Sequence, residues 1–370
     1  MRWVKLGDYI EQCDDRNSDG KYTKEDVRGI ATSKEFITTK ANLEDVSLSS
    51  YKVVKINEFA FVSDTSRRGD KMSLGFNDSK NFIVSSISSV FKVKNHKELL
   101  PEYLYMWFCR AEFDRYTRFN SWGSAREAFG FYDMCRIKIP LPGMAEQKKL
   151  VAVWKGLKNL KENNEKMAEP LLSLCQSYLK ELKHKYPSIK ISKLIKLHDI
   201  FNDNGYKYPI MGINKDKEFM PTVASIKNLD IKKYKVVKDN IFVFSGMQTG
   251  RDECIRISLY NQPKAIIVSP AYATFKLMKN NIILPDFFFL CFKRKEMDRY
   301  GWFISDSSVR SNLDWPRFMD IKIPMPPIEI QQAIVNMYNC AKEAKEIAKN
   351  ADNLIKDLCP ALMRKAAGEA

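Results

Sequence analysis

Two short polar segments carry side chains that can form paired hydrogen bonds with the edge of a flat partner. They are Ser66-Arg67-Arg68-Gly69-Asp70-Lys71 and Gly246-Met247-Gln248-Thr249-Gly250-Arg251. Arginine and glutamine can each hold a base edge in the DNA major groove with two hydrogen bonds, whereas serine, threonine and lysine mostly contact phosphates. We therefore predict nucleic-acid contacts here, with a solvated surface turn as the alternative. The candidate residues are Ser66, Arg67, Arg68, Lys71, Gln248, Thr249 and Arg251.

A second pair of segments places an arginine two residues after a small hydroxyl residue. These segments are Gly123-Ser124-Ala125-Arg126 and Ser307-Ser308-Val309-Arg310. Their candidates for phosphate or base contacts are Ser124, Arg126, Ser308 and Arg310, and an internal salt bridge of each arginine is the alternative. Trp122 and Trp302 could stack on bases, but we predict that both are buried in the core.

Residue types used in catalysis do not form recognisable patterns. His96, His184 and His198 are far apart, and none lies near a serine or cysteine in a known motif. Glycine-rich phosphate loops are missing, and so is the Asn/Asp-Pro-Pro-Tyr type of segment that adenine methyltransferases use. Eight cysteines include no Cys-x-x-Cys pair, which disfavours a zinc site or a disulfide scaffold. We predict a non-catalytic chain with reduced thiols and no cofactor or metal of its own.

One segment has the spacing of a calcium loop. Asp15, Asn17, Asp19 and Gly20 stand at positions 1, 3, 5 and 6 of an EF-hand, with Asp26 at position 12. Position 12 normally carries glutamate, and the flanking sequences do not offer two amphipathic helices. Because Asx residues and glycine also form turns for local backbone reasons, we predict a turn here.

The chain is an internal duplication. Several motifs return after 183 residues, and later ones return after 184, which one inserted residue explains. The repeats are Val27-Arg28-Gly29-Ile30 with Ile210-Met211-Gly212-Ile213, Lys34-Glu35-Phe36-Ile37 with Lys217-Glu218-Phe219-Met220, Tyr51-Lys52-Val53-Val54-Lys55 with Tyr234-Lys235-Val236-Val237-Lys238, Asp114-Arg115-Tyr116 with Asp298-Arg299-Tyr300, and Ile137-Lys138-Ile139-Pro140-Leu141-Pro142 with Ile321-Lys322-Ile323-Pro324-Met325-Pro326.

Each repeat predicts strands followed by helices. Residues 51–62 and 234–244 are rich in strand formers, and further strands are expected at 82–84 and 266–268. Pro101 should open a helix whose buried face includes Leu104, Trp107, Phe108 and Ala111, and Pro285 should open its counterpart. The Pro-x-Pro segments should then end short strands.

A long helical tail follows each repeat. Apolar residues of the first tail alternate steps of three and four, the rhythm of a coiled coil. The residues predicted to pair the helices are Leu157, Leu160, Met167, Leu171 and Leu174 in the first tail and Ala341, Ala344, Ala351, Ile355 and Leu358 in the second. Alanine opposite bulky residues would permit close approach, and two separate amphipathic helices are the alternative. Pro170 should kink or split the first helix.

Composition indicates a polyanionic partner. The 370 residues are 45% apolar, enough for two or three globular domains, and carry a formal net charge of +16. A basic but inert surface is the alternative. The N-terminus lacks an apolar leader, and the longest apolar run, 287–292, is too short for a membrane span, so we expect a cytoplasmic protein.

The repeated Pro-x-Pro exits that run into long helices, 137–147 and 321–331, resemble the specificity subunit of type I restriction-modification systems. The segments ending at Arg126 and Arg310 share this resemblance, as does Leu362-Met363-Arg364-Lys365-Ala366 near the C-terminus. The likeness covers essentially the whole chain, including its duplication. Gly143-Met144-Ala145-Glu146 departs from the pattern, since the family more often has a second proline there.

The resemblance implies an α+β fold with a pseudo-twofold internal repeat. Two similar globular α/β target recognition domains, 1–142 and 187–326, would be separated by two long antiparallel coiled-coil helices in 143–186 and 327–370. Each domain would read one half of an asymmetric, split double-stranded DNA target. Two modification subunits, which bind S-adenosylmethionine and methylate adenine, would dock on this chain, and restriction subunits would join that core.

Two other functions fit the same pattern. A specificity subunit of another restriction class would pair with a fused nuclease-methyltransferase and would differ only in its partner. A helical scaffold protein would join other proteins without binding DNA.

Overall fold

The computed structural model describes residues 2–65, 71–123, 127–222, 229–247, 252–278, 281–306 and 311–368. The chain forms two compact units, each with one repeat and one part of each long helix. Unit 1 contains Met1–Asn163 with Ile347–Ala370, and unit 2 contains Asn164–Glu346. The division passes through both long helices, so it does not follow the predicted boundaries at 142, 186 and 326, which stay a prediction.

Unit 1 contains short strands, short helices and the beginning of a long helix. The strands are β1 (Arg2–Lys5), β2 (Ile10–Cys13), β3 (Arg28–Ile30), β4 (Phe36–Thr38), β5 (Lys52–Val54), β6 (Glu58–Phe61), β7 (Leu74–Phe76), β8 (Phe82–Val84), β9 (Ser89–Val93) and β10 (Lys138–Leu141). The helices are α1 (Pro101–Phe108), α2 (Ala111–Phe119), α3 (Phe131–Arg136) and α4 (Met144–Lys185), with 3₁₀ turns at Leu6–Asp8 and Lys24–Asp26.

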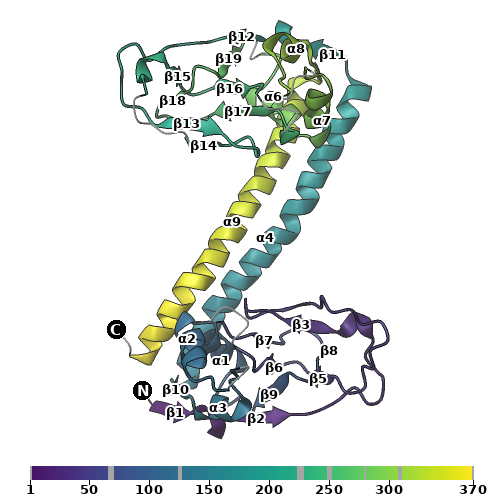
Figure 1. Ribbon diagram of the computed structural model, residues 1–370, viewed down its shortest axis with the longest axis vertical. Helices are drawn as coiled ribbons and strands as arrows, with labels where there is room; N and C mark the ends of the chain where they lie inside the picture. Colours follow the sequence, from purple (N-terminus) through teal and green to yellow (C-terminus); the bar gives the residue numbers. More distant parts are fainter. Residues whose placement is uncertain are drawn as a thin grey trace. The chain divides into compact units, whose positions relative to one another are not determined.

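Unit 2 repeats the order of the described strands and α-helices (Figure 1). Its strands are β11 (Ser188–Lys190), β12 (Ile195–Leu197), β13 (Ile210–Ile213), β14 (Phe219–Pro221), β15 (Lys235–Val237), β16 (Ile241–Ser245), β17 (Arg256–Tyr260), β18 (Ile266–Val268), β19 (Ala273–Leu277) and β20 (Lys322–Pro324). Its helices are α6 (Pro285–Phe292), α7 (Lys295–Phe303), α8 (Trp315–Asp320) and α9 (Ile328–Ala367), with 3₁₀ turns at Ile191–Lys193 and Ile231–Lys233.

A four-stranded antiparallel sheet forms the centre of each unit, in the order β2-β9-β6-β7 in unit 1 and β12-β19-β16-β17 in unit 2. Phe59 of β6 stacks on its cross-strand partner Phe91 of β9, with ring centroids 4.9 Å apart. Phe242 and Phe275 form the equivalent stacked pair at 5.1 Å. Cross-strand aromatic pairs fix strand register as well as burying apolar area, so both repeats place the same two strands in the same register.

A second group of strands covers the other end of each repeat. In unit 2, the sheet β14-β13-β18-β15 contains one parallel pair, β13 with β18. In unit 1, β3 pairs with β4 and β5 pairs with β8, and a parallel bridge joins Val27 to Ile83. The predicted strands at 51–62, 82–84, 234–244 and 266–268 are confirmed by these pairs.

The predicted proline-opened helices are also confirmed. Leu104, Trp107 and Phe108 are buried on α1, which begins at Pro101. Ala111 was wrongly placed on that face, because α1 ends at Phe108 and Ala111 begins α2 as an exposed residue. The equivalent helix α6 begins at Pro285 and buries most of its side chains.

A buried glutamine fixes the start of each long helix. In unit 2, the Gln331 side chain accepts a hydrogen bond from the N–H of Leu284 at 2.9 Å. It donates to the carbonyls of Ile282 and Pro326, also at 2.9 Å. Gln147 holds the equivalent three backbone groups in unit 1. Because unpaired backbone groups are costly when buried, each glutamine ties a Pro-x-Pro exit to the loop that precedes α1 or α6.

The long helices run antiparallel. Within unit 2, Glu169 pairs with Lys345 at 2.7 Å, and further along α4 the Cys175 thiol lies 3.9 Å from the carbonyl of Ile334. Within unit 1, Lys161 pairs with Asp352 at 2.8 Å. The predicted split at Pro170 is wrong, because α4 is one continuous helix from Met144 to Lys185 with Pro170 inside it.

The buried line of α4 is shifted by one position along the helix from the predicted line. Leu160, Met167 and Leu174 are exposed, whereas Ala168 and Cys175 are buried. In α9 the predicted Ala341, Ala344 and Ala351 are buried, as is Ala348, but Leu358 is exposed. Leu157, Leu171 and Ile355 are half-buried. Small residues in both helices allow close approach of the two backbones, so Leu160, Met167 and Leu174 are left on the outside.

The glutamine contacts make a direct stability prediction. Replacing Gln331 by Leu should lower the free energy of unfolding of unit 2 by about 3 kcal/mol, because one N–H and two carbonyls lose their partner. Urea denaturation followed by tryptophan fluorescence measures this change. The control is Gln332→Leu, because Gln332 is the next residue of the helix and is exposed. It should change stability by less than about 0.5 kcal/mol. Equal losses for both variants would contradict the role of Gln331.

The helix pairing makes a second prediction within unit 2. Ala341→Leu should destabilise the unit by about 1–3 kcal/mol, because the added atoms must enter a closely packed line. Leu174→Ala should cost less than about 1 kcal/mol, since Leu174 is exposed. Thermal unfolding of both variants gives the comparison. A larger loss of stability for Leu174→Ala than for Ala341→Leu would support the helix pairing that was predicted from the heptad pattern.

Candidate nucleic-acid interface

Most of the predicted contact residues lie outside the described part of the chain. Lys71 is described and is exposed. The residues outside it are Ser66, Arg67, Arg68, Ser124, Arg126, Gln248, Thr249, Arg251, Ser308 and Arg310. The described part of the candidate interface therefore consists of the residues that border these segments.

In unit 1 the borders of the two predicted segments are hydrogen-bonded to each other. The N–H of Thr65 donates to the carbonyl of Glu127 at 3.1 Å, and its hydroxyl donates to Ser121 Oγ at 2.8 Å. The N–H of Phe129 donates to the carbonyl of Ser63 at 2.8 Å. These contacts bring together the borders of the segment after β6 and of the segment after α2, which are far apart in the sequence.

The same arrangement recurs in unit 2 with different residues. The N–H of Leu313 donates to the carbonyl of Gly246 at 2.9 Å. A Cβ on Gly246 would lie 1.8 Å from the Leu313 carbonyl oxygen, so glycine is required for this approach. Asp306 and Asn312 join the two ends of the segment between them, with the N–H of Asn312 donating to Asp306 Oδ1 at 2.8 Å. The structure therefore brings together the borders of both predicted segments in each repeat.

Exposed aromatic side chains surround these borders. Phe119 is 82% exposed and Trp122 is 71% exposed at the end of α2, and Trp302 is 52% and Phe303 81% exposed at the end of α7. The prediction that Trp122 and Trp302 are core residues is wrong. Trp302 follows Gly301, the buried residue of α7, and therefore points outward from the helix. Trp122 lies beyond the end of α2, in an isolated backbone bridge with Ala128, so no helix face carries it into the core.

Phe119 and Phe303 are further candidate site residues, which were not predicted from the sequence. They occupy one repeat position, 184 residues apart, and their exposure suits stacking on the faces of bases. The sequence signal was available, because both phenylalanines lie two positions after a buried residue of the helix and are thus out of phase with the core face.

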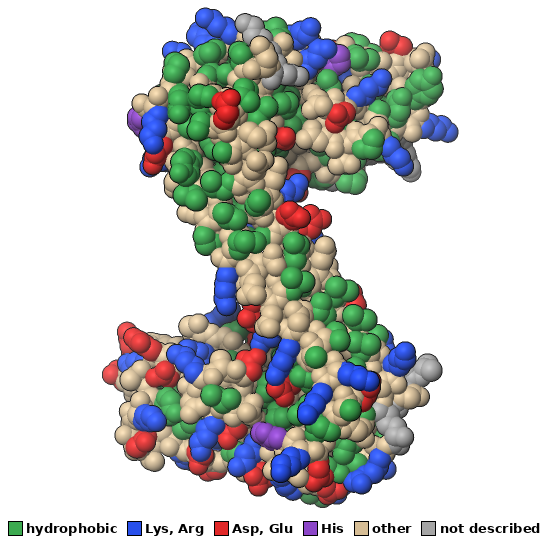
Figure 2. Space-filling model, turned by 180° about the vertical axis from the view of Figure 1, so that it is seen from behind, with side chains coloured by type: hydrophobic (Ala, Val, Ile, Leu, Met, Phe, Trp, Pro, Cys, Tyr) green, Lys and Arg blue, Asp and Glu red, His purple; other side chains and the backbone are tan. Residues whose placement is uncertain are grey.

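Charge around the borders is of mixed sign. Arg115 and Arg299 are exposed on α2 and α7, whereas Arg118 forms an ion pair with Glu127. Burial by itself raises the pKa of Asp252, but the charges of Arg256 and Lys215 hold it below its ordinary value, so Asp252 stays ionised. Figure 2 shows lysine and arginine side chains spread over the visible face rather than gathered in one stripe. On this face the positive charge is therefore distributed, which suits attraction to phosphates more than a single anion site.

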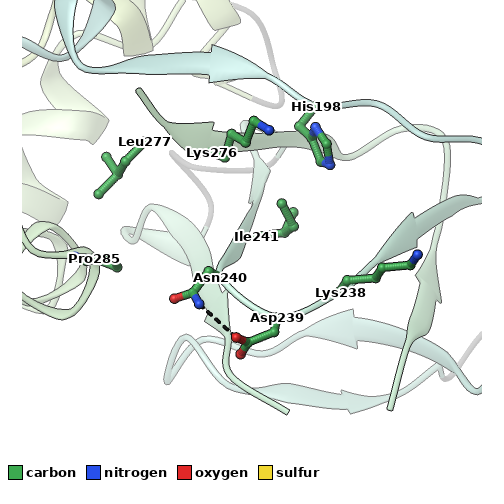
Figure 3. Close-up of a pocket in the computed structure, with 8 residues that line it drawn as sticks. All are labelled: His198, Lys238, Asp239, Asn240, Ile241, Lys276, Leu277 and Pro285. Carbon is green, nitrogen blue, oxygen red and sulfur yellow. Dashed lines mark hydrogen bonds between the residues drawn. The ribbon is translucent and has the colours of Figure 1, made fainter. Parts of the chain in front are cut away.

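A hollow in unit 2 lies away from these borders. His198, Lys276 and Leu277 line one side of it, and Lys238, Asp239, Asn240, Ile241 and Pro285 complete it (Figure 3). It lies at the start of β16, whereas Gly246 follows the end of that strand. Burial and the neighbouring lysines lower the pKa of His198. Asp239 accepts from the Asn240 amide at 2.7 Å and lies apart from His198, so the lining forms no acid–base pair.

The predicted turn at 15–26 is confirmed. Asn17 is buried, and its side chain accepts from the N–H of Tyr22 and donates to the Tyr22 carbonyl, both at 2.9 Å. Asp26 accepts from the N–H of Thr23 at 3.0 Å. Among the described residues, no group of three or more histidine, cysteine, aspartate or glutamate side chains could hold a metal ion. No helix in the described ranges is both long and apolar enough to cross a membrane.

Comparison with known proteins agrees with the duplicated geometry. The family model of the type I restriction modification DNA specificity domain matches residues 7–172 and again 178–353. No curated protein matches the sequence. The fold is similar to that of the S subunit of a type I restriction-modification system from M. genitalium, with 13% identity, a TM-score of 0.63 and coverage of 99% of this chain and 96% of that one.

Two further solved structures match over the full length with lower TM-scores. The HsdS subunit from Thermoanaerobacter tengcongensis has 18% identity and a TM-score of 0.40, covering 100% of this chain and 97% of that one. A chain from a structure described as showing complex assembly and conformational transition of the type I R-M system has 15% identity and a TM-score of 0.42, covering 100% and 98%. Since the two family matches span most of the sequence, this protein belongs to the type I restriction-modification DNA specificity family and carries two copies of its domain.

Proposed function

We propose that this chain reads an asymmetric, bipartite DNA target, with one half-site for each unit. The observation that carries this proposal is the repeated border geometry. In both units the border of a segment after the equivalent strands β6 and β16 is hydrogen-bonded to the border of a segment after α2 or α7, but the residues in those segments differ between the repeats. One frame with two sets of side chains is suited to two different half-sites.

The exposed groups divide the work of binding. Lys71, Arg115 and Arg299 would contact phosphates and orient the protein, and the arginine and glutamine residues of the predicted segments would read base edges. We infer that the chain itself is not catalytic. Methylation would be carried out by two modification subunits with bound S-adenosylmethionine, and restriction subunits would join through them, in the cytoplasm where the DNA is found.

Exposed apolar residues on α4 support docking of those partners. In unit 1, Val153 and Leu160 are each more than two-fifths exposed. In unit 2, Met167, Leu174 and Tyr178 are exposed to a similar degree. Apolar side chains at regular helical spacing that stay in water are typical of a surface that another protein covers.

Sequencing of methylated adenine in single DNA molecules tests the proposal. A host that expresses this chain with its neighbouring modification subunit should methylate one split motif that is absent when this chain is omitted. The motif supplies both half-sites and the spacer. Unchanged methylation, with both proteins expressed, would favour a helical scaffold. Methylation only with a fused nuclease-methyltransferase would assign the chain to another restriction class.

Lys71 allows a quantitative test of phosphate contact. Lys71→Ala should weaken binding to all DNA sequences alike and reduce the slope of log K against log salt concentration by about 1, because one counterion fewer is released. Titration of the assembled complex with labelled DNA at several salt concentrations gives this slope. Lys80→Ala, an equally exposed lysine beyond the opposite end of β7, should leave it unchanged. Equal effects of the two substitutions would argue against contact at Lys71.

A further inference from the structure

Two buried lysines occupy equivalent strained turns. Lys34 lies in the turn between β3 and β4, has a φ of 70° and is 5% exposed. Lys217 lies in the turn between β13 and β14, has a φ of 65° and is 4% exposed. Each turn is closed by its own backbone, since the N–H of Lys217 donates to the carbonyl of Asn214 at 3.2 Å. Glycine or asparagine is favoured at such a position, so a lysine in both repeats indicates that the side chain has a role.

Each lysine side chain and one aspartate together hold a single residue of the main chain by both its polar groups. In unit 2, Lys217 Nζ donates to the carbonyl of Ile255 at 2.8 Å and to Asp298 Oδ1 at 2.6 Å. The same Asp298 oxygen accepts from the N–H of Ile255 at 2.9 Å. We call this arrangement the lysine–aspartate clamp.

Unit 1 contains the same clamp. Lys34 Nζ donates to the carbonyl of Met72 at 2.8 Å and forms an ion pair with Asp114. Asp114 Oδ1 accepts from the N–H of Met72 at 3.1 Å. The repeated sequences around Lys34, Lys217, Asp114 and Asp298 therefore meet in space in each unit, although about 80 residues separate the members of each pair.

The clamp connects three parts of the candidate interface. Met72 and Ile255 lie between the first predicted contact segment and the strand that follows it, β7 or β17. Asp114 and Asp298 lie on α2 and α7, which lead to the second contact segment and to the exposed aromatic residues. In unit 2, Gly301 lets Ile255 approach α7, because a Cβ there would lie 2.4 Å from Ile255 Cγ1.

The other border of each first segment is already fixed by Thr65 or Gly246, as described above. The clamp fixes the second border of that segment, at Met72 or Ile255. With both borders held to α2 or α7 and to the loop after it, the bordering residues of the two contact segments of a unit have a set spacing. Strained residues and buried ion pairs persist where the surrounding structure demands a particular arrangement, and positioning of a binding surface is one such demand.

We propose that Lys34 with Asp114, and Lys217 with Asp298, are positioning residues that determine base discrimination, each pair at the half-site read by its own unit. The proposal rests on the proposed function and names no contact between the clamp and DNA. Loss of one clamp should relax reading of one half-site and leave the other half-site unchanged. A general contribution to folding would not have this one-sided effect.

Lys217→Gly is the sharpest variant, because glycine suits the turn conformation while the clamp is lost. Should the unpaired Asp298 carboxylate prevent assembly, Lys217→Gly combined with Asp298→Asn removes the charge and keeps an amide oxygen for the N–H of Ile255. The matched control is Lys235→Met in the same unit. Lys235 is also buried and pairs with Asp199 at 2.9 Å and with the carbonyl of Tyr272 at 2.7 Å, but it contacts neither border.

The experiment measures binding of the complex with its modification subunits to four duplexes. These carry the methylated motif intact, altered in either half-site, or altered in both. Lys217→Gly should reduce discrimination at one half-site by about tenfold, the loss expected when one paired base contact is misplaced, and leave the other within twofold. Lys34→Gly should affect the opposite half-site, and Lys235→Met neither.

The outcomes separate the clamp from the proposed function. If the wild type discriminates and Lys217→Gly discriminates equally well, the role of the clamp is overturned but the proposed function is not. The same holds if Lys217→Gly loses discrimination equally at both half-sites. An effect of Lys235→Met as large as that of Lys217→Gly would also overturn it, since burial of a lysine would then suffice. Absence of discrimination in the wild-type complex would overturn the proposed function and the clamp together.

Discussion

The structure depends on how the main chain is paired where it leaves regular strands and helices. Such backbone groups cannot stay buried without hydrogen-bond partners, and in both repeats buried polar side chains provide them. Gln147 and Gln331 do so at the helix starts, and Lys34 and Lys217 do so beside the contact segments. These side chains recur because each repeat places the same unpaired backbone groups in the same positions.

A rigid frame permits variation at its edge. The stacked phenylalanines of the central sheet and the glutamine contacts are the same in both units, so the strands that carry the contact segments have matching positions within each unit. The borders, in contrast, use Thr65 and Glu127 in one repeat and Gly246 and Leu313 in the other. Different side chains on an unchanged support are what the proposed reading of two different half-sites by one duplicated domain requires.

The long helices satisfy two demands with opposite residue types. Close approach of α4 and α9 requires small side chains between them, which Ala168, Ala341 and Ala344 supply. Larger apolar residues such as Leu160 and Leu174 then remain in contact with water. Their regular spacing gives α4 an apolar outer surface in each unit, which the alanine-rich inner line makes possible. The same helices thus pack together in each unit and leave an apolar line of α4 exposed.

The sequence by itself determined the duplication, the strands and the proline-opened helices, because these depend on local spacing and on residues that recur. The tertiary structure decided which helix face is buried. On α4, the line through Met167 and Leu174 lies one position from the line through Ala168 and Cys175, and only packing against α9 selects the second, which has the smaller side chains. It also decided that Trp122 and Trp302 are exposed and that Lys34 and Lys217 are buried, since these outcomes depend on partners distant in the sequence.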